Sequence, residues 1–264
     1  MKRWVKRLAW YSLTILALFG GGCATARLIS NWMLFAPPTS VYTTLRGLTM
    51  IPGEGAAQYA AVYLPNPQAR HLVILFHGNG DDLGYCWARI EGLNLNGFAV
   101  LAVEYPGYGR TGGSPSEIGL YASADAAYRY ATASLGWVPQ KIVPYGVSLG
   151  GAGAMWIASR QPVGGLILES AFTSAYAVLL PGWHFLGDRM PNLERMKRVR
   201  CPVFLLQGTK DGLGDWKHGR KLLAAAPEPK RAFWVEGAGH NNVLSTAGPR
   251  YWQELRAFEG SLPR

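Results

Sequence analysis

A serine flanked by glycines is the residue whose setting most clearly indicates chemistry. Residues 146–150 are Gly-Val-Ser-Leu-Gly, after an apolar run and before a stretch of small residues that we expect to be helical. The pattern is typical of a nucleophile elbow, a strained turn from strand to helix that lifts the hydroxyl clear of the backbone. It predicts Ser148 as the nucleophile of a hydrolytic reaction. The alternative is a serine that merely caps a helix.

An acid and a histidine follow, each behind an apolar, strand-like run. Asp211 comes after residues 201–207, and His240 lies in a glycine-rich loop after residues 231–235. A histidine can take the proton of a serine hydroxyl, while a carboxylate orients the imidazole and stabilises its cation. Serine, acid, histidine is one of the chain orders known for such triads. We therefore predict a catalytic triad of Ser148, Asp211 and His240.

Other acids and histidines compete for these roles. Asp215 ranks second as the acid because we expect it to open the helix 216–225 as its N-cap. His184 and His218 follow no strand, so we expect them to be incidental. His77 stands at a strand end, where a structural role in shaping the next loop is favoured.

A second glycine-rich loop precedes the serine in the chain. The buried-strand pattern of residues 71–76 leads directly into His-Gly-Asn-Gly-Asp-Asp at residues 77–82. A backbone N–H in such a loop can stabilise the oxyanion of a tetrahedral intermediate. We predict Asn79 as one donor and Leu149, the residue after the nucleophile, as the other.

Together these residues resemble the α/β-hydrolase superfamily, and more narrowly its membrane-anchored branch of Bem46-like, serine-aminopeptidase-like and ABHD17-type depalmitoylase proteins. The resemblance spans roughly residues 40–260 and implies the fold and the triad, but not the substrate. Residues 212–214 differ from it, because Gly-Leu-Gly replaces the usual valine-proline pair after the acid. The residues that carry it are His77-Gly78-Asn79-Gly80, Glu104-Tyr105-Pro106-Gly107-Tyr108-Gly109-Arg110, Gly146-Val147-Ser148-Leu149-Gly150-Gly151, Leu168-Glu169-Ser170-Ala171-Phe172-Thr173, Gln207-Gly208-Thr209-Lys210-Asp211 and Gly239-His240.

The rest of the chain predicts an α/β fold that positions these residues. The 264 residues, 49% of them hydrophobic, suit one domain with a single core. Expected strands are 43–51, 58–64, 71–76, 98–104, 141–145, 165–169, 202–207 and 232–235, and expected helices are 83–94, 117–135, 149–161, 216–226 and 249–259. This alternation predicts a mostly parallel eight-stranded sheet with helices on both faces, opened by an antiparallel hairpin.

The resemblance also implies a small cap over the active site, formed by residues 172–199. This segment carries Tyr176, Trp183, Phe185 and Met190 among other apolar side chains. Such side chains would suit an acyl chain if they line the site. The alternative is that they only pack on the body of the domain.

The amino terminus predicts attachment to a membrane. A basic stretch at residues 1–7 precedes an apolar run at 8–19, which is a signal-type pattern within residues 1–30. Three fates remain open: an uncleaved anchor, lipidation at Cys23, or cleavage after Ala26. The four basic residues favour a cytoplasmic amino terminus, so the hydrolase domain, residues 43–264 behind a linker at 31–42, is expected on the extracytoplasmic (periplasmic) side.

The net charge and the cysteines bear on possible binding partners and on disulfide or metal chemistry. The net charge is +10, but four basic residues lie in the amino-terminal stretch and no nucleic-acid motif is present, so we expect no nucleic-acid partner. The basic run 195–200 is expected to be a solvated helix face or a contact for anionic lipid headgroups. Cys86 and Cys201 are expected to be buried free thiols, and no cofactor or metal is expected.

These patterns predict a serine hydrolase that cleaves a carboxylic ester, thioester or similar acyl bond of a small or lipid-like substrate, through an acyl-enzyme. Such an esterase-type activity (EC 3.1) is favoured over a peptidase (EC 3.4). The alternatives are a serine peptidase or acyltransferase on the same scaffold, and a non-catalytic envelope binding protein. A missing triad member would favour the last, but all three are present.

Overall fold

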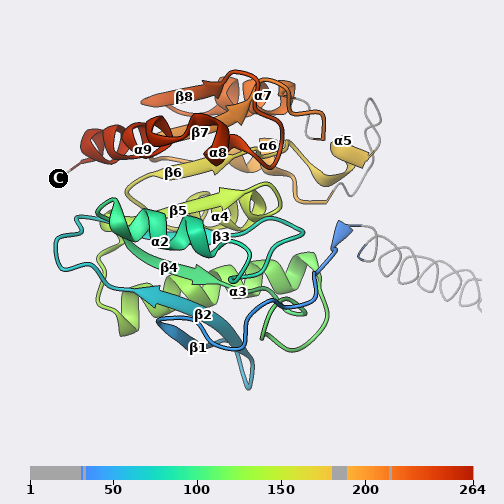
Figure 1. The fold of residues 1–264 in the computed structure, drawn as a ribbon, viewed down its shortest axis with the longest axis vertical. Coiled ribbons are helices and arrows are strands. Elements are labelled where there is room, and N and C mark those ends of the chain that lie inside the picture. Colours follow the sequence, from blue (N-terminus) through green and yellow to red (C-terminus); the bar gives the residue numbers. More distant parts are fainter. Residues whose placement is uncertain (1–30, 32–33, 180–188, 214–215, 264) are drawn as a thin grey trace, which may run out of the picture. The chain divides into compact units, whose positions relative to one another are not determined.

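The computed structural model describes residue 31 and residues 34–179, 189–213 and 216–263 (Figure 1). The chain forms two compact units, Met1–Ala36 and Pro37–Arg264. The predicted signal segment, with Cys23, lies outside the described residues. None of the described helices combines the length and apolarity that a membrane crossing needs.

One eight-stranded sheet forms the centre of the larger unit (Figure 1). Its spatial order is β1-β2-β4-β3-β5-β6-β7-β8, with β2 antiparallel to both neighbours and all other pairs parallel. The predicted mostly parallel sheet and its opening hairpin are confirmed. The strands are β1 (Leu48–Pro52), β2 (Gln58–Leu64), β3 (Leu72–Phe76), β4 (Ala99–Val103), β5 (Ile142–Val147), β6 (Leu166–Glu169), β7 (Val203–Gly208) and β8 (Lys230–Val235).

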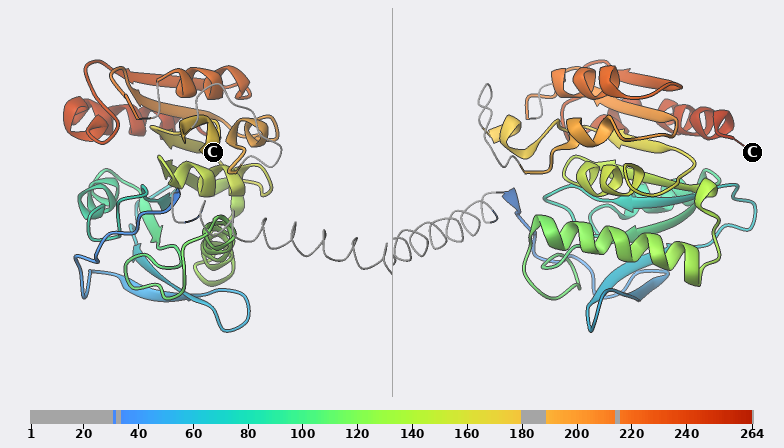
Figure 2. Two further views of the ribbon diagram at one scale, coloured as in Figure 1. Left: turned by 90° about the vertical axis from the view of Figure 1, so that its right-hand side faces the viewer. Right: turned by 180° about the vertical axis from the view of Figure 1, so that it is seen from behind.

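Helices cover both faces of this sheet (Figures 1 and 2). The described helices are α2 (Trp87–Leu95), α3 (Glu117–Arg129), α4 (Gly150–Ala158), α5 (Ala175–Leu179), α6 (Asn192–Met196), α7 (Lys217–Ala225), α8 (Val243–Ala247) and α9 (Pro249–Ser261). On one face, α2 and α9 contribute Ile90 and Leu255 to a shared core cluster. α3, α4 and α7 lie on the other face, where Gly219 of α7 abuts Leu205. β3 and β4 are buried at every position, as expected for strands covered on both sides.

Several helices differ from the sequence-based expectation in length. The predicted helix 117–135 ends at Arg129 and continues as a π-helical turn, Tyr130–Ser134. The helix expected from residue 83 begins only at Trp87, because the Asp82 carboxylate accepts the N–H of Tyr85 (2.8 Å) in a preceding turn. α5, α6 and α8 were not predicted; five residues are too few to show a helical period.

The segment expected to form a cap is described at its two ends. It starts with α5 and finishes with α6, whereas residues 180–188, with Trp183 and Phe185, lie outside the described residues. Glu117, at the start of α3, binds the second described part of this segment, at Arg189 and Met190. Its carboxylate accepts hydrogen bonds from Arg189 Nε (3.0 Å), the backbone N–H of Met190 (2.8 Å) and the Tyr121 hydroxyl (2.6 Å).

The basic run 195–200 is only in part a solvated face. Its other basic side chains are exposed, but the Arg195 guanidinium lies over the rings of Tyr121 and Trp156, 4.4 and 5.2 Å from their centroids. A planar cation gains from stacking on aromatic faces, so this arginine joins α6 to α3 and α4. The predicted solvated face thus holds for the other basic residues of the run, while Arg195 is half-buried against the two rings.

Candidate active site

The turn at Ser148 has the strained geometry that its glycines predict. Ser148 joins β5 to α4 with φ +49°, a left-handed conformation that residues other than glycine seldom adopt. Its backbone N–H donates to the carbonyl of Glu169 on the neighbouring strand (2.8 Å). A Cβ at Gly146 would lie 2.4 Å from the carbonyl oxygen of Gly150, and one at Gly150 would lie 2.1 Å from that of Phe76. Both positions therefore require glycine.

The structure brings the three predicted triad residues together. His240 Nε2 lies 2.8 Å from Ser148 Oγ, and His240 Nδ1 lies 2.8 Å from Asp211 Oδ2. The Asp211 side chain is fully buried, while that of His240 is 12% exposed. The three residues follow β5, β7 and β8, whose carboxyl ends meet at one edge of the sheet, where α/β folds place their sites.

Asp211 is held by two further donors. The side-chain amide of Gln207 donates to Oδ2 (2.7 Å), and the backbone N–H of Leu213 donates to Oδ1 (3.1 Å). Leu213 belongs to the Gly-Leu-Gly stretch that departs from the family pattern, yet its N–H points to the carboxylate. Donors on both oxygens complement an ionised acid and fix its plane relative to His240.

The loop after β3, where Asn79 was predicted as an oxyanion donor, lies against the elbow. A Cβ at Gly150 would come within 2.7 Å of the His77 carbonyl oxygen, so the start of α4 packs directly on this loop. Two tyrosine hydroxyls hold it: that of Tyr105 donates to the His77 carbonyl (2.8 Å), and that of Tyr108 donates to Asn79 Oδ1 (2.6 Å). Leu149, the other predicted donor, immediately precedes α4.

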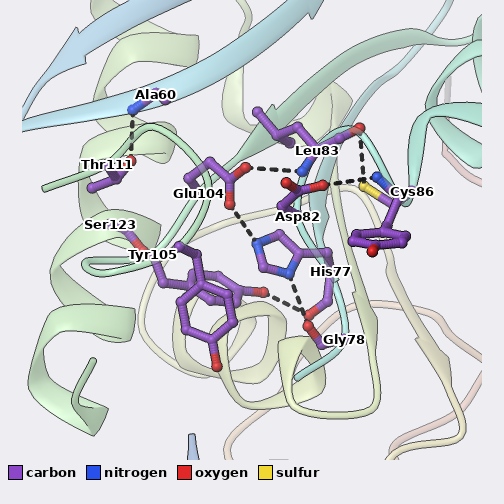
Figure 3. A network of polar contacts seen from close by, with 12 residues as sticks. Ala60, His77, Gly78, Asp82, Leu83, Cys86, Glu104, Tyr105, Thr111 and Ser123 are labelled. Atoms are coloured by element: carbon purple, nitrogen blue, oxygen red, sulfur yellow. Dashed lines mark hydrogen bonds and ion pairs between the residues drawn. The ribbon is translucent and has the colours of Figure 1, made fainter. Parts of the chain in front are cut away.

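His77 forms a buried pair with Glu104 beneath this loop (Figure 3). His77 Nε2 lies 3.0 Å from Glu104 Oε2, and the other Glu104 oxygen accepts from the Tyr42 hydroxyl (2.8 Å) and the backbone N–H of Leu83 (2.8 Å). Burial alone would lower the pKa of His77, but the hydrogen bond and charge of Glu104 outweigh it and raise that pKa. The predicted structural setting of His77 is thus what the geometry supports.

The competing residues lie elsewhere or outside the described part. His218 Nδ1 is 2.8 Å from the hydroxyl of Thr173, while His184 and Asp215 fall outside the described residues.

Cys86 and Cys201 are both buried and free, as predicted, and burial raises the pKa of Cys201 to about 12. The part of the chain that the structure describes holds no group of side chains fit to bind a metal ion.

Sequence reasoning assigned no role to three residues that contact the triad residues or their strands. Gln207 contacts Asp211, as described above. Ser170, which follows β6, donates its hydroxyl to the backbone carbonyl of His240 (3.0 Å). Glu169 is the third: its backbone carbonyl accepts the N–H of Ser148, and its side chain, 2% exposed, pairs with Arg89. All three stood inside family-like motifs, and for Glu169 an acidic residue ending an apolar strand was a further signal.

Glu169 anchors a polar network inside the core between β5, β6, α2 and α9. Its carboxylate takes a two-point hydrogen bond from Arg89 (2.6 and 3.0 Å) and one from the Tyr251 hydroxyl (2.6 Å), and it also contacts the Tyr145 hydroxyl. Burial, followed by the Glu169 charge, raises the pKa of Tyr145, so that it stays a protonated donor. β6, whose last residue accepts the N–H of Ser148, is therefore held to α2 by the buried ion pair of Glu169 and Arg89.

Comparisons with known proteins agree with this geometry. Residues 71–197 match the family model of the alpha/beta hydrolase fold. The protein aho-3 of Caenorhabditis elegans is 34% identical over 197 residues, covering 74% of this chain and 59% of that protein. Alpha/beta hydrolase domain-containing protein 17B of Xenopus tropicalis is 34% identical over 199 residues, covering 73% and 67%. The chain thus spans about three fifths to two thirds of the length of these relatives.

Solved structures share the fold at low sequence identity. The esterase Pf2001 of Pyrococcus furiosus superposes with a TM-score of 0.70 at 17% identity, covering 86% of this chain and 99% of that one. Est1E of Butyrivibrio proteoclasticus, solved with ferulic acid bound, gives 0.65 at 18%, covering 79% and 98%. The chain belongs to the α/β-hydrolase fold family and, within it, to the branch of the alpha/beta hydrolase domain-containing 17 proteins.

Proposed function

We propose that this protein is a serine hydrolase that cleaves a carboxylic ester or thioester through an acyl-enzyme on Ser148. The observation that carries the proposal is the continuous relay of two 2.8 Å contacts from Ser148 through His240 to Asp211. A serine that only capped α4 would gain nothing from an imidazole at its hydroxyl. The left-handed backbone at Ser148 also supports the proposal, because such strain is typical of sites where a side chain must be presented.

The reaction follows from the roles that these positions allow. His240 Nε2 takes the proton of the Ser148 hydroxyl as the oxygen attacks the carbonyl carbon, and Asp211 stabilises the imidazolium. The imidazolium then returns the proton to the leaving alcohol or thiol, which leaves an acyl-serine. Water, deprotonated by the same imidazole, attacks the acyl carbon, and the acid product departs.

The negative oxygen of both tetrahedral intermediates needs donors. We assign this role to the backbone N–H groups of Asn79 and Leu149. Support comes from the close packing of α4 on the loop after β3 and from the Tyr108 hydroxyl, which fixes the Asn79 side chain at 2.6 Å. Pre-oriented donors in a fixed loop stabilise the developing charge without reorganising during the reaction.

Ester or thioester cleavage is favoured over peptide cleavage by the proteins that share the fold. Several of the superposing structures are those of esterases, and one contains ferulic acid. The apolar residues of segment 172–199 would accommodate a lipid-like acyl group where they line the site. A graded series of p-nitrophenyl esters from acetate to laurate tests this, with hydrolysis expected to rise with chain length; hydrolysis of peptide anilides alone would contradict it.

Kinetics with one variant test the mechanism. Ser148→Ala is expected to lower kcat for p-nitrophenyl butyrate by about 10⁴- to 10⁶-fold, since the nucleophile is lost. The matched control is Ser134→Ala, which removes an exposed serine hydroxyl away from the site and is expected to keep full activity. Hydrolysis by Ser148→Ala at the wild-type rate would exclude the proposed nucleophile.

We propose in addition that the amino terminus attaches the protein to a membrane with the hydrolase unit on the extracytoplasmic side. The support is the basic stretch followed by an apolar run in residues 1–19. Fractionation of cells that express the full chain tests this. Recovery in the membrane fraction after a high-salt wash is expected, with digestion by protease added outside the membrane. Release into the soluble fraction would contradict it, and Cys23→Ser separates lipidation from an uncleaved anchor.

A further inference from the structure

The residues Glu169 and Ser170, where β6 ends, touch every segment that carries a proposed triad residue. The Glu169 carbonyl accepts the N–H of Ser148 (2.8 Å), which fixes the nucleophile to β6. The backbone N–H of Ser170 donates to Leu206 on β7 (3.0 Å), the strand that leads to Asp211. The Ser170 hydroxyl donates to the carbonyl of His240 itself (3.0 Å).

The third of these bonds is the one that depends on a side chain. Ser170 is 1% exposed, so its hydroxyl has lost its hydration and is satisfied by the His240 carbonyl. Other anchors of the histidine loop lie before His240: Gly237 N–H donates to the Thr209 hydroxyl (3.0 Å), Lys210 N–H donates to the carbonyl of Ala238 (2.8 Å), and Gly239 N–H donates to the Asn242 side chain (2.6 Å). Ser170 thus holds the backbone of His240 directly.

The left-handed backbone at Ser170 indicates that the serine hydroxyl contributes an interaction that glycine could not. Its φ is +49°, the same left-handed value as at Ser148, and glycine would adopt that conformation without strain. A serine therefore keeps a strained backbone at a buried position where the smaller residue suits the chain better. What serine supplies and glycine lacks is the donor to His240.

We propose that Ser170 is a positioning residue, whose hydroxyl holds His240 at the distance from Ser148 and Asp211 that proton transfer needs. The inference rests on the proposed function. Without the bond, the His240 carbonyl loses its partner and the loop after β8 moves more freely. The imidazole then spends less time in line with both partners, and displacements of about 1 Å can cost a hundredfold in rate.

Two substitutions separate positioning from folding. Ser170→Ala removes the hydroxyl and keeps the strained backbone, whereas Ser170→Gly removes the hydroxyl and relieves the strain. Their effects on the melting temperature should therefore differ, with the glycine variant the more stable. Their effects on kcat should agree, because both lack the donor. Ser123→Ala is the matched control, since Ser123 is also buried and donates to a backbone carbonyl, that of Leu120 (2.8 Å), inside α3.

The experiment measures kcat and KM for p-nitrophenyl butyrate per active site, with the sites counted by titration with a fluorophosphonate. We expect both Ser170 variants to lose about 10- to 100-fold in kcat with KM within twofold, and Ser123→Ala to match the wild type. Wild-type kcat per site in either Ser170 variant would overturn the inference and leave the proposed function standing. A wild-type protein that neither hydrolyses the ester nor reacts with the probe would overturn both.

Discussion

The side chains of Gln207 and His240 converge on the same oxygen of Asp211. Gln207 Nε2 lies 2.7 Å and His240 Nδ1 lies 2.8 Å from Oδ2, and all of the Asp211 side chain is buried. Gln207 is itself 1% exposed, and its own carbonyl oxygen has no hydrogen-bond partner among the described residues. Gln207 thus donates its amide N–H to Asp211 while its amide oxygen has no partner among the described residues. This hydrogen bond fixes the orientation of the Asp211 carboxylate.

Replacing Gln207 should therefore impair the proposed proton relay. Gln207→Leu removes a hydrogen bond to a charged group, worth about 1.5–3 kcal/mol, so kcat for ester hydrolysis should fall by about 10- to 100-fold. KM should change little, since the substituted side chain is buried behind Asp211. Steady-state kinetics at pH 8 measure both constants, and Gln253→Leu, at an exposed glutamine of α9, serves as the control. An unchanged kcat in Gln207→Leu would remove this role.

The glycine at position 150 should be irreplaceable for packing. A Cβ there would lie 2.1 Å from the carbonyl oxygen of Phe76, a backbone atom that cannot rotate away. Gly150→Ala should lower the free energy of unfolding by at least the ~1–3 kcal/mol typical of overpacking. Gly260→Ala is the control, because a Cβ there meets nothing within 4 Å. Urea unfolding measures both variants, and equal stability of the two would contradict the close contact between α4 and the end of β3.

The buried pair of His77 and Glu104 should make stability depend on pH. The pKa of His77 is raised in the folded state, so folding takes up a proton in the interval between the ordinary pKa of about 6.5 and the raised value. The free energy of unfolding should therefore fall as the pH rises through that interval. Urea titrations between pH 6 and 9 should show this fall in the wild type.

The same titrations with Glu104→Gln give the control for this pair. The substitution keeps the size of the side chain but removes the charge that raises the His77 pKa, so the downward slope should disappear. Breaking the buried pair should also cost about 3–5 kcal/mol at pH 6. If the slope persists in Glu104→Gln, the pH dependence arises from another group.

Removing Arg89 should destabilise the core beneath the nucleophile strand. Arg89→Ala leaves the Glu169 carboxylate, 2% exposed, without its cation, at a cost of about 3–5 kcal/mol. Arg46→Ala is the comparison, because its ion pair with Glu91 is 3.5 Å long and mostly exposed and should contribute at most about 1 kcal/mol. Chemical unfolding measures the difference between the two, and similar losses for both would show that the buried network contributes little.

The sheet was predictable because its strands are short apolar runs, most of which end at a glycine or a polar residue. β2 was placed to the residue and most other strands to within two residues, but the first strand was predicted to begin at residue 43, five residues before β1 does. Ser148, Asp211 and His240 could be found for a related reason: each stands just past such a run, and the ends of neighbouring parallel strands meet at one edge. The glycine-flanked serine, the strand-like runs and the order along the chain were enough to predict that these three residues meet.

The supporting contacts could not be predicted in the same way. The pairing of His77 with Glu104, and of Ser170 with the His240 carbonyl, joins residues 27 and 70 positions apart and depends on the spatial order of the strands. β3 and β5 are neighbours although β4 lies between them in sequence, and no local pattern reveals this. Gln207 stands in one of the family-like motifs, but an amide within an apolar strand shows what it binds only once Asp211 is placed beside it.

The most direct test of the central claim is the site at which a fluorophosphonate reacts. The claim is that Ser148 is a nucleophile activated by the 2.8 Å contact with His240. Intact-mass and peptide mass spectrometry should show one adduct per chain, on the peptide that contains Ser148, and His240→Ala should slow its formation by several orders of magnitude. No adduct on the wild-type protein, or an adduct on another residue that persists in Ser148→Ala, would contradict the claim.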